Sequence, residues 1–191
     1  MPVWAWFLIA AAIILIAGLI IGVTRSLTGR RRTQRLQERF GPEYERTVAE
    51  TGEQGAAEKE LAARERKRKK LDIVELSPAA REGYTERWRV VQSTFVDDPS
   101  GALAAADELV THVMRDRGYP VDDFEQQASD ISVDHPTVVQ NYRAGHGIYR
   151  SQQHGDVGTE ERRQAFVHYR GLFEELLAPH KGEEESVQAP A

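Results

Sequence analysis

Histidine and carboxylate side chains are the groups in this sequence with the clearest capacity for chemistry. The chain has six histidines and no cysteine, which excludes disulfides, thiol nucleophiles and thiolate metal sites. Asp130, Asp134 and His135 lie close together in the sequence, and His146 follows. If the two segments that carry these residues cross in the fold, the four side chains could form a metal or acid–base site.

The local sequence gives this hypothesis little support. It contains no HExxH or Glu-x-x-His spacing, no nucleophile elbow and no glycine-rich phosphate loop. Asp134 can equally be the N-cap of a helix, with His135 in its first turn. His146 lies four residues after Tyr142 and three before Tyr149, as a core histidine would. We therefore expect no catalytic residue and no cofactor, and keep Asp134, His135 and His146 as the alternative, a metal or acid–base site.

The segment that positions these residues, 77–179, is predicted to be a bundle of about five helices. Ser77-Pro78 is a typical helix start and marks the domain boundary. Apolar residues recur at helical spacing, and no stretch shows the alternation of a strand. The predicted fold class is all-α. The large apolar residues expected in the core are Tyr84, Trp88, Val91, Phe95, Leu103, Val110, Phe124, Tyr142, Phe166 and Phe173.

Polar residues and glycine predict where these helices begin and end. Gly118 is placed to end the second helix, and Asp122 or Asp123 to cap the third. Asp134 is expected to open the fourth helix and Thr159 the last. Residues 180–191, with three consecutive glutamates, are predicted to be a disordered tail.

Residues 25–76 are predicted to be a charged helical stalk. Between residues 53 and 70, Leu61 is the only large apolar side chain, so the helix is expected to be solvated rather than part of a core. The basic run 64–70 has three interpretations: a solvated helix end, a contact with anionic lipid, or a nucleic-acid patch. The first is favoured, and the third is disfavoured because the run has no interleaved aromatic residues.

The run from Val3 to Val23 is uncharged and has the length of a single membrane-spanning helix, with residues 1–24 as the anchor. Trp4 and Trp6 suit the headgroup level of one leaflet. Gly18 and Gly22 have the small-xxx-small spacing that lets two such helices pack closely.

The charges that flank this run predict its orientation. Arginines follow it and none precedes it, which favours an uncleaved anchor with the N-terminus outside and the C-terminal part in the cytoplasm. Residues 25–76 hold 14 basic and 10 acidic side chains, whereas residues 78–178 hold 10 basic and 17 acidic ones. The arginines that could face anionic lipid are Arg25, Arg30, Arg31, Arg32 and Arg35.

Four stretches, RFGPEYERTV (39–48), RWRVVQSTFVDDP (87–99), RGYPVDDFEQQASDISVDHPTVVQNYR (117–143) and RRQAFVHYRGLFEELL (162–177), resemble a group of short bacterial proteins. These are membrane or secreted proteins of unknown function from high-GC soil bacteria and actinobacteria. The resemblance covers most of residues 39–177. It implies no activity and carries no catalytic residue to this chain, and a secreted protein would have the opposite orientation to the one predicted above.

The sequence thus favours a single-pass membrane protein whose cytoplasmic helical domain is an interaction or scaffold module. The expected partners are the membrane and either another protein or a second copy of the chain, and no nucleic acid. The alternatives are a metal-binding or acid–base enzyme that uses Asp134, His135 and His146, and an envelope protein that associates with anionic lipid.

Overall fold

The structure is a computed structural model that describes residues 29–155 and 157–179. The predicted anchor, the flanking Arg25 and the tail 180–191 lie outside these residues. No helix in the described part is long and apolar enough to cross a membrane. The described residues contain helices and no strand, which confirms the predicted all-α class.

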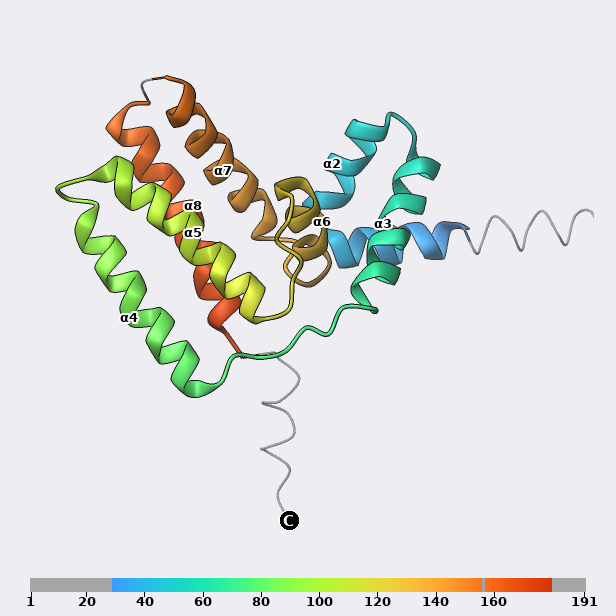
Figure 1. The fold of residues 1–191 in the computed structure, drawn as a ribbon. Helices are drawn as coiled ribbons and strands as arrows, with labels where there is room; N and C mark the ends of the chain where they lie inside the picture. Colours follow the sequence, from blue (N-terminus) through green and yellow to red (C-terminus); the bar gives the residue numbers. More distant parts are fainter. Residues whose placement is uncertain (1–28, 156, 180–191) are drawn as a thin grey trace, which may run out of the picture. The chain divides into compact units, whose positions relative to one another are not determined.

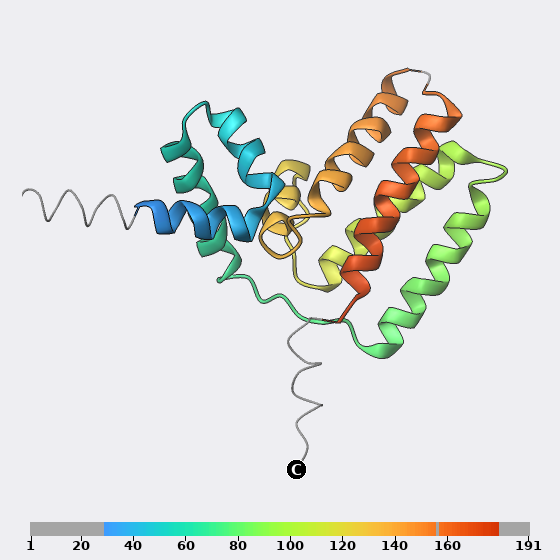
Figure 2. The same cartoon turned by 180° about the vertical axis from the view of Figure 1, so that it is seen from behind.

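The chain divides into two compact units between Arg39 and Phe40. In the first unit, the described residues 29–39 are helical. The second unit contains seven helices, which Figures 1 and 2 show from opposite sides: α2 (Pro42–Thr51), α3 (Gln54–Arg68), α4 (Pro78–Thr94), α5 (Pro99–Asp116), α6 (Phe124–Asp134), α7 (Val139–His154) and α8 (Thr159–Leu177).

The main core lies among α4, α5, α7 and α8. α8 packs between α5 and α7, and α4 packs against α5 (Figure 1). Seven of the ten residues expected in the core are buried, namely Tyr84, Trp88, Leu103, Val110, Tyr142, Phe166 and Phe173. The other three, Val91, Phe95 and Phe124, are partly buried and pack against the same core.

The large side chain of Trp88 links α4 to α8. The indole ring of Trp88 stacks on Phe166 and on Phe173, with ring centroids 5.1 and 4.6 Å away. Stacked aromatic pairs of this kind add to the stabilisation that comes from burial alone. The narrow buried stripe of α4 leaves most of its surface open to solvent.

Helices α2 and α3 form a hairpin that belongs to the same compact unit as the bundle. Gly52 ends α2 in the left-handed conformation, with φ 70°, which glycine adopts without strain. α3 packs against α6 and buries Ala57, Leu61 and Arg64. The prediction of a helix solvated on every side is therefore wrong for this face. The compact unit also begins at Phe40, whereas we placed a domain boundary at Ser77.

Most of the predicted helix boundaries agree with the structure. The side chains of Ser77, Asp98 and Asp123 accept hydrogen bonds from backbone N–H groups in the first turns of α4, α5 and α6. Gly118 follows α5 with φ 91°, and a Cβ there would lie 2.3 Å from the Asp72 carbonyl oxygen. Glycine is therefore required both by the backbone conformation and by the space.

Two predicted helix starts are wrong. Asp134 is the last residue of α6 rather than the N-cap of the next helix, and α7 begins only at Val139. The residue that precedes α8 is Gly158, so Thr159 is the first helical residue and not the cap. The Gly158 N–H instead donates to the Glu161 carboxylate, at 3.0 Å, which supplies the capping interaction from within the helix.

Candidate functional site

Three helices meet at the C-terminal end of α6, where Asp134 and His135 lie. α3 approaches from one side through Arg68, and α8 from the other through Glu175. The guanidinium of Arg117, which follows α5, donates to the carbonyl of Val74, beyond α3, at 3.4 Å and to that of Leu176, in the last turn of α8, at 2.8 Å. The site therefore brings together segments that are far apart in the sequence.

One carboxylate oxygen of Asp134, Oδ2, has two partners. Its carboxylate pairs with the Arg68 guanidinium and accepts a hydrogen bond of 2.7 Å from the Tyr119 hydroxyl. Burial, together with the negative charge of Asp134, raises the pKa of Tyr119, so that hydroxyl stays protonated and keeps donating. Asp134 therefore holds α3 and the α5–α6 connection together.

His135 is buried, with 7% of its surface exposed, and its two ring nitrogens have different surroundings. Nδ1 lies 3.2 Å from the Glu175 carboxylate, while Nε2 is buried without a hydrogen-bond partner. Burial lowers the pKa of the imidazole, and the nearby Arg117 lowers it further against the opposing effect of Glu175. The neutral ring therefore donates from Nδ1–H to Glu175 and has its lone pair on Nε2.

A hollow of about 340 Å³ lies beside this pair. Its lining comes from the end of α6 and from the end of α8: Asp134, His135, Pro136, Thr137, Glu175, Ala178 and Pro179. The lining holds two carboxylates and no lysine or arginine.

His146 lies elsewhere in the unit and has a different carboxylate partner. Its Nδ1 is 3.4 Å from Asp107 of α5, and its ring stacks on Phe124, with centroids 3.6 Å apart. The same Asp107 oxygen accepts a hydrogen bond of 2.7 Å from the Tyr169 hydroxyl. Asp134, His135 and His146 thus have separate partners, and the described residues contain no cluster of three His, Asp or Glu side chains suited to a metal ion.

A buried glutamate forms a second polar centre, which the sequence interpretation missed. Glu43, in the first turn of α2, has no exposed surface. Its carboxylate lies 2.9 Å from the Arg64 guanidinium of α3 and 2.8 Å from that of Arg143 of α7. The Gln140 amide donates to it at 2.8 Å, and Arg46 of the same helix lies 3.2 Å away. One carboxylate thus joins α2, α3 and α7.

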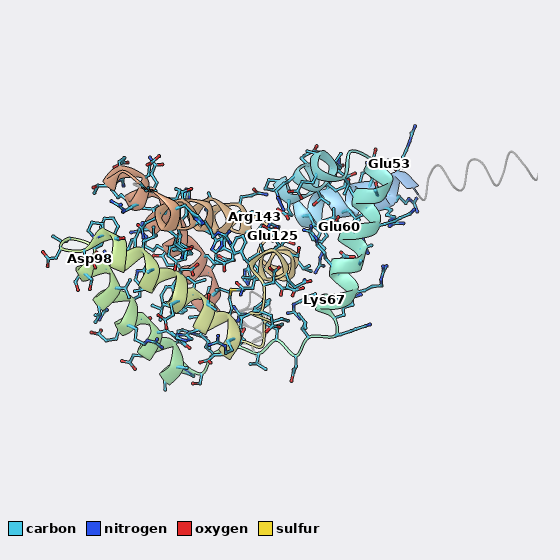
Figure 3. The ribbon with its side chains drawn as sticks, turned by 45° about the horizontal axis from the view of Figure 1, so that its top comes forward. Glu53, Glu60, Lys67, Asp98, Glu125 and Arg143 are labelled. Carbon is cyan, nitrogen blue, oxygen red and sulfur yellow. The ribbon has the colours of Figure 1, made fainter. Side chains whose placement is uncertain are left out.

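The charged residues around these contacts lie along the side of α6 that faces α3. Figure 3 labels Lys67, Glu60, Arg143 and Glu125 at this junction. The Lys67 ammonium is 2.8 Å from Asp130, which is 1% exposed, and Arg143 also pairs with Glu125 at 3.0 Å. The only sign of these ion pairs in the sequence was the spacing of Arg64, Lys67 and Arg68, which puts the three side chains on one face of α3. A charged stripe without apolar residues is ordinarily solvated, so this spacing did not predict that α3 packs against other helices.

Several predicted residues have no place in these centres. Arg30, Arg31, Arg32 and Arg35 are exposed within the helical residues 29–40, and Arg25 lies outside the described chain together with the predicted anchor residues Val3, Trp4, Trp6, Gly18, Gly22 and Val23.

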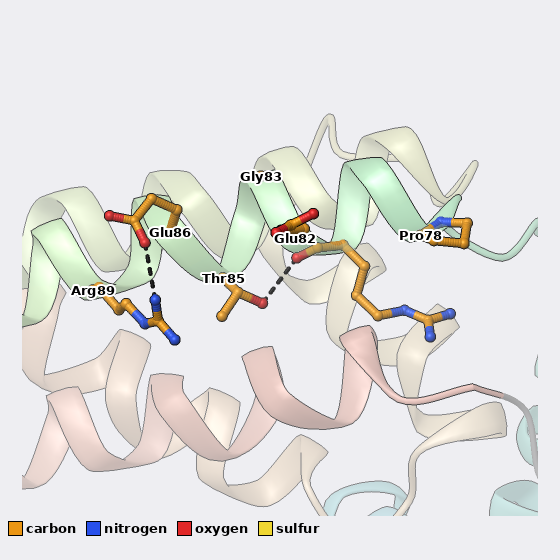
Figure 4. Close-up of a pocket in the computed structure, with 7 residues that line it drawn as sticks. Pro78, Glu82, Gly83, Thr85, Glu86 and Arg89 are labelled. Carbon is orange, nitrogen blue, oxygen red and sulfur yellow. Dashed lines mark hydrogen bonds and ion pairs between the residues drawn. The ribbon is translucent and has the colours of Figure 1, made fainter.

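Another hollow, of about 550 Å³, is lined by residues of α4 alone (Figure 4). Two contacts within the helix engage some of its polar groups: Arg89 pairs with Glu86 at 3.1 Å, and the Thr85 hydroxyl donates to the Arg81 carbonyl at 2.8 Å. Because no second element contributes a side chain, it has no convergent set of groups of the kind that defines a binding site.

No family model matches the chain, and comparison with curated proteins and with solved structures found no match.

Proposed function

We propose that this chain is a membrane-tethered interaction module whose compact unit associates with a second copy on the cytoplasmic side. The tether and its orientation rest on the uncharged run from Val3 to Val23 and on the arginines that follow it. Residues 24–39 alone separate this run from the compact unit, which begins at Phe40.

The observation that carries the proposal is a hollow of about 280 Å³ between α4 and α5. Its apolar lining consists of Val90, Val91, Ala105 and Leu109, and Val90 is 58% exposed. Among the described residues, few large apolar side chains are exposed, and two of the four that are lie on α4 or directly after it, at Val90 and Val96. Exposed apolar surface with a polar rim is typical of a protein interface.

The rim of the hollow favours a second copy as the occupant. Arg87 on α4 and Glu108 on α5 are both exposed and carry opposite charges. Under twofold symmetry the same patch of each copy meets the other, so Arg87 of one copy would face Glu108 of its partner. Tethering raises the effective concentration of such an encounter, and the glycine spacing of Gly18 and Gly22 suits close packing of two anchors.

Cysteine crosslinking in native membranes tests this proposal cleanly, because the chain contains no other cysteine. Val90→Cys should give a covalent dimer with a short bis-maleimide. Val167→Cys is the matched control, because Val167 is a valine that is 41% exposed on α8, away from the hollow, and it should stay monomeric.

Charge reversal adds a second readout. Arg87→Glu should lower the yield of the Val90→Cys dimer, and the combined change Arg87→Glu with Glu108→Arg should restore it, because opposite charges again face each other. A Val90→Cys protein that remains monomeric, or equal crosslinking from both cysteine positions, would exclude the proposed interface.

A further inference from the structure

Helix α3 carries cations on two faces, and one of these faces is docked within the compact unit. Its buried residues are Ala57, Leu61 and Arg64, which follow each other at spacings of four and three residues. Arg64 pairs with acids of α2 and α3, and Lys67 and Arg68 pair with acids of α6. The cations of this face are therefore neutralised by carboxylates of the same unit.

The opposite face of α3 is open to solvent. Lys59, Ala63 and Arg66 repeat the spacing of the buried residues two positions further along the helix. An offset of two residues turns a side chain by about 200°, so these residues point away from the docked face. Lys70 follows four residues after Arg66, just beyond the helix end. We call these four exposed residues the outer stripe.

The cations of the outer stripe have no ion-pair partner among the described residues, and the stripe itself contains no acid. The acidic residues of α3 lie off it, because Glu58 and Glu65 are half-buried and Glu60 pairs with Arg64. Cations near a helix C-terminus also favour the negative end of the helix dipole. That effect does not account for Lys59, which lies more than two turns before the end of α3.

The outer stripe belongs to a unit that a short segment connects to the proposed anchor. Residues 24–39 alone separate the uncharged run from the compact unit, and they span about 24 Å if they are helical throughout. A unit held at this distance can turn one of its faces toward the lipid headgroups. The bundle is disfavoured as that face, because residues 78–178 hold 10 basic and 17 acidic side chains.

We infer that the outer stripe of α3 lies on the anionic lipid surface of the cytoplasmic leaflet, with Lys59, Arg66 and Lys70 toward the headgroups. Each lysine or arginine near such a surface raises the occupancy of the contact about fivefold. The inference rests on the tether and orientation proposed above. It is independent of the interface proposed for α4 and α5, because that interface involves neither α3 nor lipid.

Fluorescence quenching at a single thiol tests the contact, because the chain contains no cysteine of its own. Full-length Ala63→Cys is labelled with a bimane fluorophore and reconstituted into vesicles in which some lipids carry a nitroxide on the headgroup. Quenching should be severalfold stronger in vesicles that contain phosphatidylglycerol than in pure phosphatidylcholine. It should fall again in 1 M salt, where the screening length is about 3 Å.

Val96→Cys is the control for position. Val96 is 83% exposed and follows α4, on the opposite side of the compact unit from α3 (Figures 1 and 2). A bimane at this position should be quenched equally in the two kinds of vesicle.

Charge reversal shows whether the outer stripe itself makes the contact. Arg66→Glu should lower the quenching at Ala63→Cys severalfold in phosphatidylglycerol vesicles. Arg150→Glu is the matched variant, because it reverses an exposed arginine on α7 and changes the net charge equally, and it should leave the quenching unchanged. Equal effects of the two variants, or equal quenching of Ala63→Cys in both kinds of vesicle, would overturn the inference.

Flotation of the same samples with phosphatidylcholine vesicles in 1 M salt reports on the tether alone. Protein that does not float would overturn the tether and the inference with it. Protein that floats without quenching that depends on phosphatidylglycerol would overturn only the inference. Quenching that a short RNA abolishes would also overturn it, and would assign the outer stripe to nucleic acid.

Discussion

At the scale of single residues, the most consequential group is the buried carboxylate of Glu43. A charge without exposed surface is stable only where partners replace its hydration, and Arg64, Arg143 and Gln140 do so here. Glu43→Gln keeps the shape but leaves two largely buried guanidinium groups without their shared counter-ion. Removing one partner of a buried pair costs about 3–5 kcal/mol. Chemical denaturation of the purified protein should show a loss of that size.

Glu45→Gln is the matched control, because Glu45 lies in the same first turn of α2 but is exposed. Its effect should remain within about 0.5 kcal/mol, as for most surface substitutions. Equal effects of the two variants would mean that the Glu43 network contributes no more than a surface charge.

His135 should make stability depend on pH. Its folded-state pKa is lowered, chiefly by burial, whereas the unfolded chain has the ordinary value of about 6.5. Below that value the unfolded state binds more protons than the folded state, so stability falls as the pH drops from 7 toward 5. Glu175, Asp134 and Arg117 face the ring and remain in place in the variant His135→Asn, which should melt with a smaller loss over this range.

His154→Asn serves as the control for this measurement, because His154 is exposed at the end of α7. Its thermal melting should keep the pH dependence of the unmodified protein. A His135→Asn protein with an unchanged slope between pH 7 and 5 would contradict the assignment of the lowered pKa to this ring.

At the scale of elements, local chemistry accounts for what the sequence could and could not predict. The starts at Ser77 and Asp123 were predictable because a cap involves only the adjacent turn. The start predicted at Asp134 was wrong, and the nearby Pro136 fits both cases, because proline is common just after a helix as well as in the first turn of one. The docking of α3 was not predictable, because its partners, Asp130 and Asp134, are more than sixty residues away.

The docking of α3 on α6 should be weakened by reversing one charge. Lys67→Glu places a second carboxylate against Asp130, which is almost completely buried and then loses its ammonium partner. A buried acceptor left unsatisfied costs about 1–3 kcal/mol. Amide hydrogen exchange should therefore speed up in α2 and α3 but not in α4 and α5. Lys59→Glu, on the exposed side of α3, should leave exchange unchanged, and a uniform increase over all helices would contradict separate docking.

The attachment of α4 should depend on the ring of Trp88 rather than on its N–H group. Nε1 is buried without a hydrogen-bond partner, so Trp88→Phe removes no hydrogen bond, whereas Trp88→Ala removes both stacking contacts with α8. Replacing a buried aromatic by alanine costs about 3–5 kcal/mol. Denaturation should show that loss for alanine and a clearly smaller one for phenylalanine, and similar losses for both would mean that a single phenyl ring does not replace the stacking of the indole on α8.

At the scale of the whole molecule, the helical class and the extent of the compact unit depend on different interactions. The helical class was predictable because apolar periodicity over 77–179 reports directly on a packed core. The extension of the compact unit back to Phe40 was not, because polar contacts of Glu43, Lys67 and Arg68 hold the α2–α3 hairpin in place. Charged residues in a sequence do not reveal whether their partner is solvent or a distant helix.

Orientation is the property of the whole chain that decides where this unit works. The arginines after Val23 predict that the unit faces the cytoplasm, because positively charged flanks stay on that side. Val96→Cys provides the only thiol of the chain, at a position that is 83% exposed beyond α4. A membrane-impermeant maleimide should label it in permeabilised cells and not in intact ones. Replacing Arg30, Arg31 and Arg32 by glutamate should increase labelling in intact cells, because it removes much of the positive flank. Strong labelling of Val96→Cys in intact cells with all arginines present would place the unit on the opposite side of the membrane.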